Sequence, residues 1–180
     1  MTDLTVWPSE LPAALAELPE HVALVLGASP RPLSELFELS TAEGPLLIVL
    51  TGAELGYPEL FPTLDRVIDG RNAPTALVIG DGWIGTEGPD VSAALVGASA
   101  VTLARSIAVR RHLTGRVNVV CVPEALVGEA GSQRGPLALD IGSADVADVV
   151  AFLLGDLSSY IDGQVLYADG GRQLFSSLTA

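Results

Sequence analysis

Short apolar runs, separated by Gly, Pro and polar residues, dominate the hydrophobic pattern of this 180-residue chain. Four of them are rich in Val and Leu and are bounded by turn residues: 21–26 (HVALVL), 75–79 (TALVI), 116–122 (RVNVVCV) and 164–167 (QVLY). Such runs predict strands that are buried on both faces. Residues 46–51 (LLIVLT) have the same character, but at this length periodicity cannot distinguish a strand from the interior of a long buried helix.

Two longer apolar segments lie between these runs and predict helices. In residues 143–154, valines and leucines share one stripe between Ser143, a predicted cap, and Gly155, which ends the helix. Residues 91–104 contain no charge, and arginines gather only where positive charge suits the helix dipole, near the end of that segment. Strands that alternate with helices are typical of a parallel sheet. We therefore predict an α/β, Rossmann-like parallel sheet of four to five strands with flanking helices, in a single domain over residues 1–180.

The segment at residues 91–113 also predicts an interface. A helix that is apolar on all sides is buried on more than one side, so in a chain of this length we expect it to contact its own sheet and a second subunit. Small residues on one stripe would let another helix approach closely, while Leu95, Leu103 and Ile107 would anchor the helix to the sheet. The candidate interface residues are Ala94, Val101, Ala104 and Ala108.

Composition narrows the function classes. The chain has twenty-two acidic residues against nine basic ones and a formal net charge of −13, which disfavours binding to nucleic acid or to an anionic membrane surface. No apolar run approaches the roughly 20 residues of a membrane span, and no signal-peptide pattern follows Met1. We expect a cytoplasmic protein. All nine basic residues are arginine, so no lysine is present for a Schiff base, a P-loop or a Tyr–Lys proton relay.

Few side chains are candidates for chemistry. Asp81, Glu87 and Asp90 follow a predicted strand and could form an acid/base pair or a Mg²⁺ site, although a solvated loop is the simpler interpretation. Cys121, the single cysteine, could pair with His112 as a nucleophile, but a buried core thiol is the ordinary role. Four arginines could clamp a phosphate, or could serve helix ends and interface ion pairs: Arg105, Arg110, Arg111 and Arg116. Trp83 is a packing anchor or the wall of a residual pocket.

The second half of the chain resembles the short-chain dehydrogenase/reductase family. Residues 135–171 end in Ser-Ser-Tyr-Ile, Gly-Gln-Val and Asp-Gly-Gly, a pattern similar to that family's last helix, substrate loop and last strand. Residues 116–118 (RVN) resemble the opening of its sixth strand, and residues 104–108 (ARSIA) the end of its central interface helix. The resemblance implies a Rossmann-like fold that corresponds to the second half of such an enzyme.

The first half can be placed on the family in two registers. In the first, which is nearly free of gaps, residues 24–29 end the family's fourth strand, residues 46–51 belong to a long helix, and the first three strands are missing. In the second, residues 22–33 are the family's glycine-rich turn, with Gly27 in the first glycine position and Arg31 and Leu33 in the other two. We prefer the first register and the helix. In neither register does a site remain for the cofactor pyrophosphate.

The family's catalytic residues are also missing. Counted back from Arg105, the tyrosine position holds Ala93 and the lysine position Gly97, while the serine falls on Gly80 or Asp81 and the asparagine on Val49. We therefore assign no catalytic, cofactor-binding or metal-binding residue and expect no cofactor.

What remains is the half of the fold that mediates oligomerisation in the family. The resulting hypothesis is a non-catalytic subunit that pairs with an active, full-length family member in a hetero-oligomer. The alternatives are a homo-oligomeric scaffolding or ligand-binding protein, and an enzyme of another class that uses a cleft beside Asp81 and Glu87.

Overall fold

Five parallel strands form one sheet in the order β1-β2-β3-β4-β5. The computed structural model describes residues 22–26, 44–50, 60–84, 91–111, 115–123, 126–127 and 141–176. The strands are β1 (Val22–Leu26), β2 (Leu46–Leu50), β3 (Thr75–Gly80), β4 (Val117–Val122) and β5 (Val165–Tyr167). The predicted fold class, a Rossmann-like α/β sheet, is confirmed.

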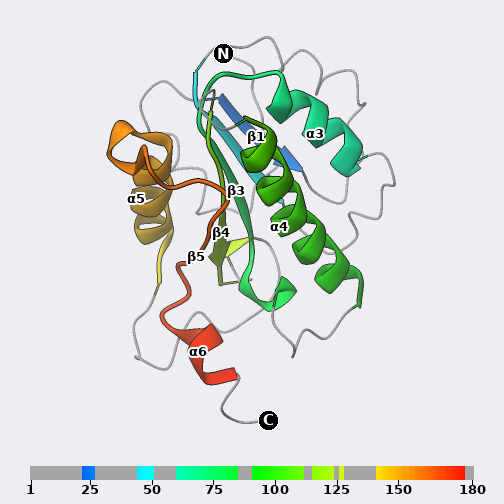
Figure 1. Ribbon diagram of the computed structural model, residues 1–180. Coiled ribbons are helices and arrows are strands. Elements are labelled where there is room, and N and C mark those ends of the chain that lie inside the picture. Colours follow the sequence, from blue (N-terminus) through cyan, green and yellow to red (C-terminus); the bar gives the residue numbers. More distant parts are fainter. Residues whose placement is uncertain are drawn as a thin grey trace.

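Helices cover both faces of this sheet. In Figure 1, α3 (Leu60–Asp69) and α4 (Val91–Arg111) lie on one face and α5 (Ser143–Leu154) lies on the other. Every residue of β2, β3 and β4 is buried. The continuous apolar runs in these strands follow from that position, because an interior strand that is covered on both faces has no side facing water. The short α6 (Arg172–Ser176) follows β5.

The preferred helical assignment of residues 46–51 is wrong. Leu46–Leu50 is the strand β2, which pairs in parallel with both β1 and β3. All five of its side chains are fully buried. Five consecutive apolar residues are buried together in an interior strand, where alternate side chains enter the two layers above and below the sheet.

The position of β2 also overturns the preferred register of the first half. In doubly wound folds strand 1 lies next to strand 4, in the order 3-2-1-4-5-6. Here β1 is an edge of the sheet and β2 is its neighbour. The observed order therefore fits β1 as a first strand followed directly by a fourth, with no strand beyond β1 among the residues that the structure describes. This favours the second register, in which Gly27, Arg31 and Leu33 follow β1; these three lie outside the described residues.

The Arg-Val-Asn segment holds the turn that leads into β5. The Asn118 side chain, 1% exposed, donates from Nδ2 to the Ile161 carbonyl at 2.9 Å and accepts from the Gln164 amide at 3.0 Å. The Val117 amide donates to Asp162 Oδ1 at 2.8 Å, and Arg116 donates to the Gly155 carbonyl at 2.8 Å. The motif therefore acts as a set of bonds between β4 and residues 155–164, and these bonds set the register of β5.

The ends of α5 differ slightly from the expectation. Gly142, and not Ser143, is the residue before the first turn. The carboxylate of Asp145 accepts a hydrogen bond from the Gly142 amide at 2.8 Å, which satisfies one of the free amides at a helix start. Gly155 follows the last turn, as predicted.

Replacing Asn118 by Ala should reduce the free energy of unfolding by about 2–4 kcal/mol, because the carbonyl of Ile161 and the amide of Gln164 lose their partner together. Gln164→Ala is the matched control. It removes an exposed bond from the same turn and should change stability by no more than about 0.5 kcal/mol. Urea unfolding of the three proteins measures both effects. Equal stability of Asn118→Ala and the parent chain would show that the turn is held by other contacts.

Candidate functional site

Two buried carboxylates lie at the carboxyl end of the sheet, the edge at which open α/β folds bind ligands. Asp81 follows β3 and is 1% exposed, and Asp169 follows β5 and is 2% exposed. Oδ1 of Asp81 accepts from the Gly82 amide at 2.9 Å, and its Oδ2 lies 3.3 Å from Nε of Arg172. Asp169 accepts from the amides of Gly171 and Gln173 at 2.8 and 2.9 Å. Both carboxylates thus have structural partners, and Asp81 is not open to solvent as a cleft residue would be.

The backbone after β3 is in direct contact with α4. The 3₁₀ turn η1 (Asp81–Trp83) ends in Trp83, which is 1% exposed. A Cβ placed on Gly97 of α4 would lie 2.7 Å from the carbonyl carbon of Trp83, far inside van der Waals contact, and still closer to the carbonyl oxygen. The helix and the turn therefore leave no space for a side chain at position 97, and Trp83 is a packing anchor with no exposed face to line a pocket.

The remaining candidates for chemistry do not form a site in the described part of the chain. Cys121 is fully buried in β4, where burial, reinforced by the charges of Asp81 and Asp169, raises the pKa of its thiol. Such a thiol stays protonated and is not a nucleophile. His112, Glu87 and Asp90 lie outside the described residues. No three His, Cys, Asp or Glu side chains among the described residues come together as metal ligands.

The four candidate arginines have different surroundings in the fold. Arg110 forms ion pairs with Asp65 and Asp69 of α3. Arg111 is 4% exposed, and the pKa of its guanidinium is lowered by burial, against the opposing charges of Asp69 and Asp162. Arg116 bonds the turn before β5, and Arg105 is exposed on α4. They do not form a joint phosphate clamp.

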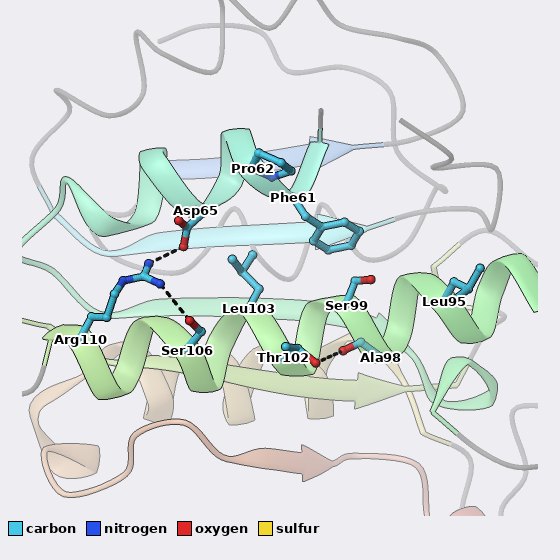
Figure 2. Close-up of a pocket in the computed structure, with 10 residues that line it drawn as sticks. All are labelled: Phe61, Pro62, Asp65, Leu95, Ala98, Ser99, Thr102, Leu103, Ser106 and Arg110. Atoms are coloured by element: carbon cyan, nitrogen blue, oxygen red, sulfur yellow. Dashed lines mark hydrogen bonds and ion pairs between the residues drawn. The ribbon is translucent and has the colours of Figure 1, made fainter. Parts of the chain in front are cut away.

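A shallow groove of about 480 Å³ runs between α3 and α4. Figure 2 shows its lining residues, with the ion pair of Arg110 and Asp65 at one end and Phe61 and Leu95 toward the other. The hydroxyl of Ser106 accepts from Arg110 at 2.9 Å. A groove between two helices can receive a helix of another chain. We therefore take this groove as the candidate contact surface of α4.

The predicted interface stripe lies partly inside the molecule. Ala104 is buried against the chain's own core, and Ala94, Val101 and Ala108 are half-buried. Leu103 and Ile107 are buried, as predicted for anchors, but the assignment of Leu95 to the sheet side is wrong. The exposed apolar residues of the helix are Val91 (76%), Leu95 (62%) and Val109 (79%). The interface stays a prediction, and these three residues mark its outer face.

By length and composition alone, α4 is also long and apolar enough to cross a membrane. Its inner residues, however, pack on β3, β4 and η1 in the described fold. A core helix of an α/β fold meets the same criteria of length and hydropathy, so α4 gives no reason to place the chain in a membrane. The cytoplasmic location stays a prediction.

Comparison with known proteins agrees with this geometry. Residues 98–173 match the family model described as enoyl-(acyl carrier protein) reductase. The chain aligns with the 3-alpha-hydroxysteroid dehydrogenase of Pseudomonas sp. B-0831, solved with NADH, at a TM-score of 0.66 and 19% identity, covering 96% of each chain. For the enoyl-acyl carrier protein reductase of Bacillus cereus the TM-score is 0.67 at 12% identity, covering 91% of this chain and 90% of that one.

A third solved structure carries the family name directly. It is a short chain dehydrogenase family protein from Francisella tularensis, with a TM-score of 0.62 at 15% identity, covering 92% of this chain and 95% of the other. The fold is that of the short-chain dehydrogenases/reductases. The predicted resemblance to this family is therefore confirmed, while identities this low establish fold and not activity. No curated protein matches the sequence.

The positions counted for the family's catalytic residues lie on α4 and at the end of β3. Ala93 and Gly97, the positions counted for the family's tyrosine and lysine, both lie on the buried face of α4. Of the two positions counted for the serine, Gly80 ends β3 and Asp81 lies in η1, against which α4 packs. Gly97 packs directly on Trp83 of this turn, and the carboxylate of Asp81 is paired with Arg172.

Gly97→Ala should destabilise the protein by about 2 kcal/mol or more. At an unconstrained helix position this change stabilises by about 1 kcal/mol, but here the added methyl overlaps the backbone of Trp83 and forces helix and turn apart. Ala98→Ser, at the exposed neighbouring position, is the control and should shift stability by about 0.5 kcal/mol at most. Thermal unfolding followed by circular dichroism gives the comparison. If Gly97→Ala proved neutral or stabilising, α4 and η1 would not be in direct contact.

Proposed function

We propose that this chain is a non-catalytic short-chain dehydrogenase-like subunit, which pairs with a full-length active family member and stabilises or shapes it. The observation that carries the proposal is the close packing of α4 on Trp83 at Gly97. The same helix that contains the family's catalytic positions is sealed against the turn on its inner face and presents exposed apolar side chains on its outer face.

Several features support the loss of hydride-transfer chemistry. The family's mechanism uses a tyrosine as acid/base and a lysine that lowers the tyrosine pKa, and this chain has no lysine at all. At the position counted for the tyrosine stands Ala93, 3% exposed. The carboxylate of Asp81 is engaged by Arg172, so it is also a poor candidate for acid/base work in an enzyme of another class.

The outer surface of α4 supports the docking role. Exposed apolar side chains that share one face mark interaction sites more often than they mark plain surface. On α4 these are Val91, Leu95 and Val109, of which Leu95 lines the groove together with Phe61. Arg110 is paired within the chain with Asp65 and Asp69, so its guanidinium does not need an acidic group from a partner.

The ion pairs of Arg110 at the α3–α4 groove also favour a second candidate function, a homo-oligomeric scaffold or binding protein. Two copies of a chain with a net charge of −13 repel each other at long range. If they met through the α3–α4 groove, the guanidinium of Arg110 in each copy would offset part of this repulsion. Co-purification from the native host distinguishes the candidates: an active short-chain dehydrogenase in the complex supports the first, and a homo-oligomer that ignores added family members supports the second.

The isolated protein should bind NAD(H) and NADP(H) no more tightly than millimolar. The pyrophosphate of a dinucleotide needs glycines where the chain turns from the first strand into a helix, and the second register places Arg31 and Leu33 at two of those positions. Titration calorimetry of the purified chain provides the measurement, with an active family member as positive control. Micromolar affinity would contradict this prediction and would return a cofactor role to the chain.

Leu95→Arg should disrupt the assembly. A guanidinium buried without a partner in an interface costs several kcal/mol, which lowers association by a factor of about 10³. Leu157→Arg is the matched control, because Leu157 is 89% exposed and lies outside the groove. Val101 is a less suitable position, since its side chain also packs against the core.

Sedimentation of each variant with the co-purified partner measures the effect. Loss of the complex for Leu95→Arg, with Leu157→Arg unchanged, supports docking through the α3–α4 groove. An intact complex in both variants would place the interface elsewhere. A parent chain that is a stable monomer with no family member attached would reject the proposed function itself.

A further inference from the structure

Two residues of the short helix α6, Arg172 and Gln173, contact Asp81, the residue that follows β3. Nε of Arg172 lies 3.3 Å from Oδ2 of Asp81, and Nε2 of Gln173 donates to the Asp81 carbonyl at 2.6 Å. Two consecutive side chains of α6 thus hold both the carboxylate and the backbone of one buried residue, 91 and 92 positions earlier in the chain. Figure 1 places α6 beyond the end of the sheet, on the side where β3 ends.

The turn at residues 169–171 sets the direction of these two side chains. After β5, Gly170 and Gly171 adopt φ values of 64° and 82°, a backbone region that favours glycine. Asp169 closes the turn by accepting from the amides of Gly171 and Gln173. The Asp-Gly-Gly sequence therefore fixes the direction in which the chain leaves β5, and Arg172 and Gln173 reach Asp81 from there.

These contacts with Asp81 help to hold the segment in place. α6 has five residues, far fewer than an isolated helix requires in water. Leu174 is 72% exposed, so burial of its side chain contributes little. The ion pair with Asp81 and the hydrogen bond from Gln173 are, in contrast, partly or fully shielded from solvent, where charged contacts count for more.

We propose that Arg172–Ser176 forms a strap, which Asp81 holds closed at the carboxyl end of the sheet. In this arrangement the buried carboxylate after β3 serves as an anchor for the C-terminal segment, and the chain's own terminus occupies the end of the sheet that would otherwise receive a ligand. The strap opens when Arg172 and Gln173 lose Asp81, while the sheet itself stays folded. The proposal does not depend on which partner the α3–α4 groove binds.

Hydrogen exchange of the full-length protein, read by mass spectrometry, tests the strap. Asp81→Asn and Arg172→Ala should each speed exchange in the peptide that covers residues 172–176 about tenfold or more, since the amides of Gln173 and Leu174 lose their ordered acceptors when the strap opens. Asp81→Asn and Arg172→Ala each break the same ion pair. The double variant should therefore exchange no faster than the faster single variant. Arg110→Ala, which breaks an ion pair on α4, is the control and should leave that peptide unchanged.

Two outcomes would overturn the strap. One is unchanged exchange at residues 172–176 in folded Arg172→Ala. The other is an additive effect in the double variant, which would mean that Asp81 and Arg172 act independently. If Asp81→Asn fails to fold, Arg172→Ala and Gln173→Ala decide the matter, because both changed residues are only half-buried.

Discussion

The direct contact between α4 and the turn after β3 constrains the rest of this structure. At Gly97 the helix approaches the carbonyl group of Trp83 so closely that even a methyl group does not fit. This contact brings the helix down onto the sheet, buries Trp83, and aligns the inner residues of α4 with β3 and β4. It also leaves no room for a side chain at position 97, between the helix and the turn.

The motifs that resemble those of the short-chain dehydrogenases/reductases are the ones that hold the backbone together. Asn118 satisfies a carbonyl and an amide of the turn before β5, and Asp162 satisfies the amide of Val117. Each of these bonds replaces water at a buried or half-buried backbone group, which would be costly to leave unpaired. Such residues are needed whether or not a substrate binds, and so a chain can keep them while the catalytic positions change.

Two surfaces of the same molecule then take different roles. The carboxyl end of the sheet is closed by the ion pair of Asp81 with Arg172 and by the Asp169 turn. The outer face of α4 exposes Val91, Leu95 and Val109 among polar side chains, and Leu95 lines a groove in which Arg110 is paired with Asp65 and Asp69. A fold that usually binds ligands at its strand ends is here arranged to present a helix face, which is the physical basis for the proposed role as a partner subunit.

The sequence by itself determined the fold class, the boundaries of α4 to within a few residues, and the absence of a lysine-dependent mechanism. Those properties depend on local pattern and composition. It could not decide between helix and strand for residues 46–51, because five apolar residues in a row are compatible with any fully buried position; only pairing with β1 and β3 made them a strand. Nor could it separate Leu95 from Leu103, since the uncharged stretch 91–104 has no charged side chain to mark the outer face of the helix. That choice belongs to the tertiary structure, in which packing on Trp83 and the sheet fixes the rotation of α4 about its own axis.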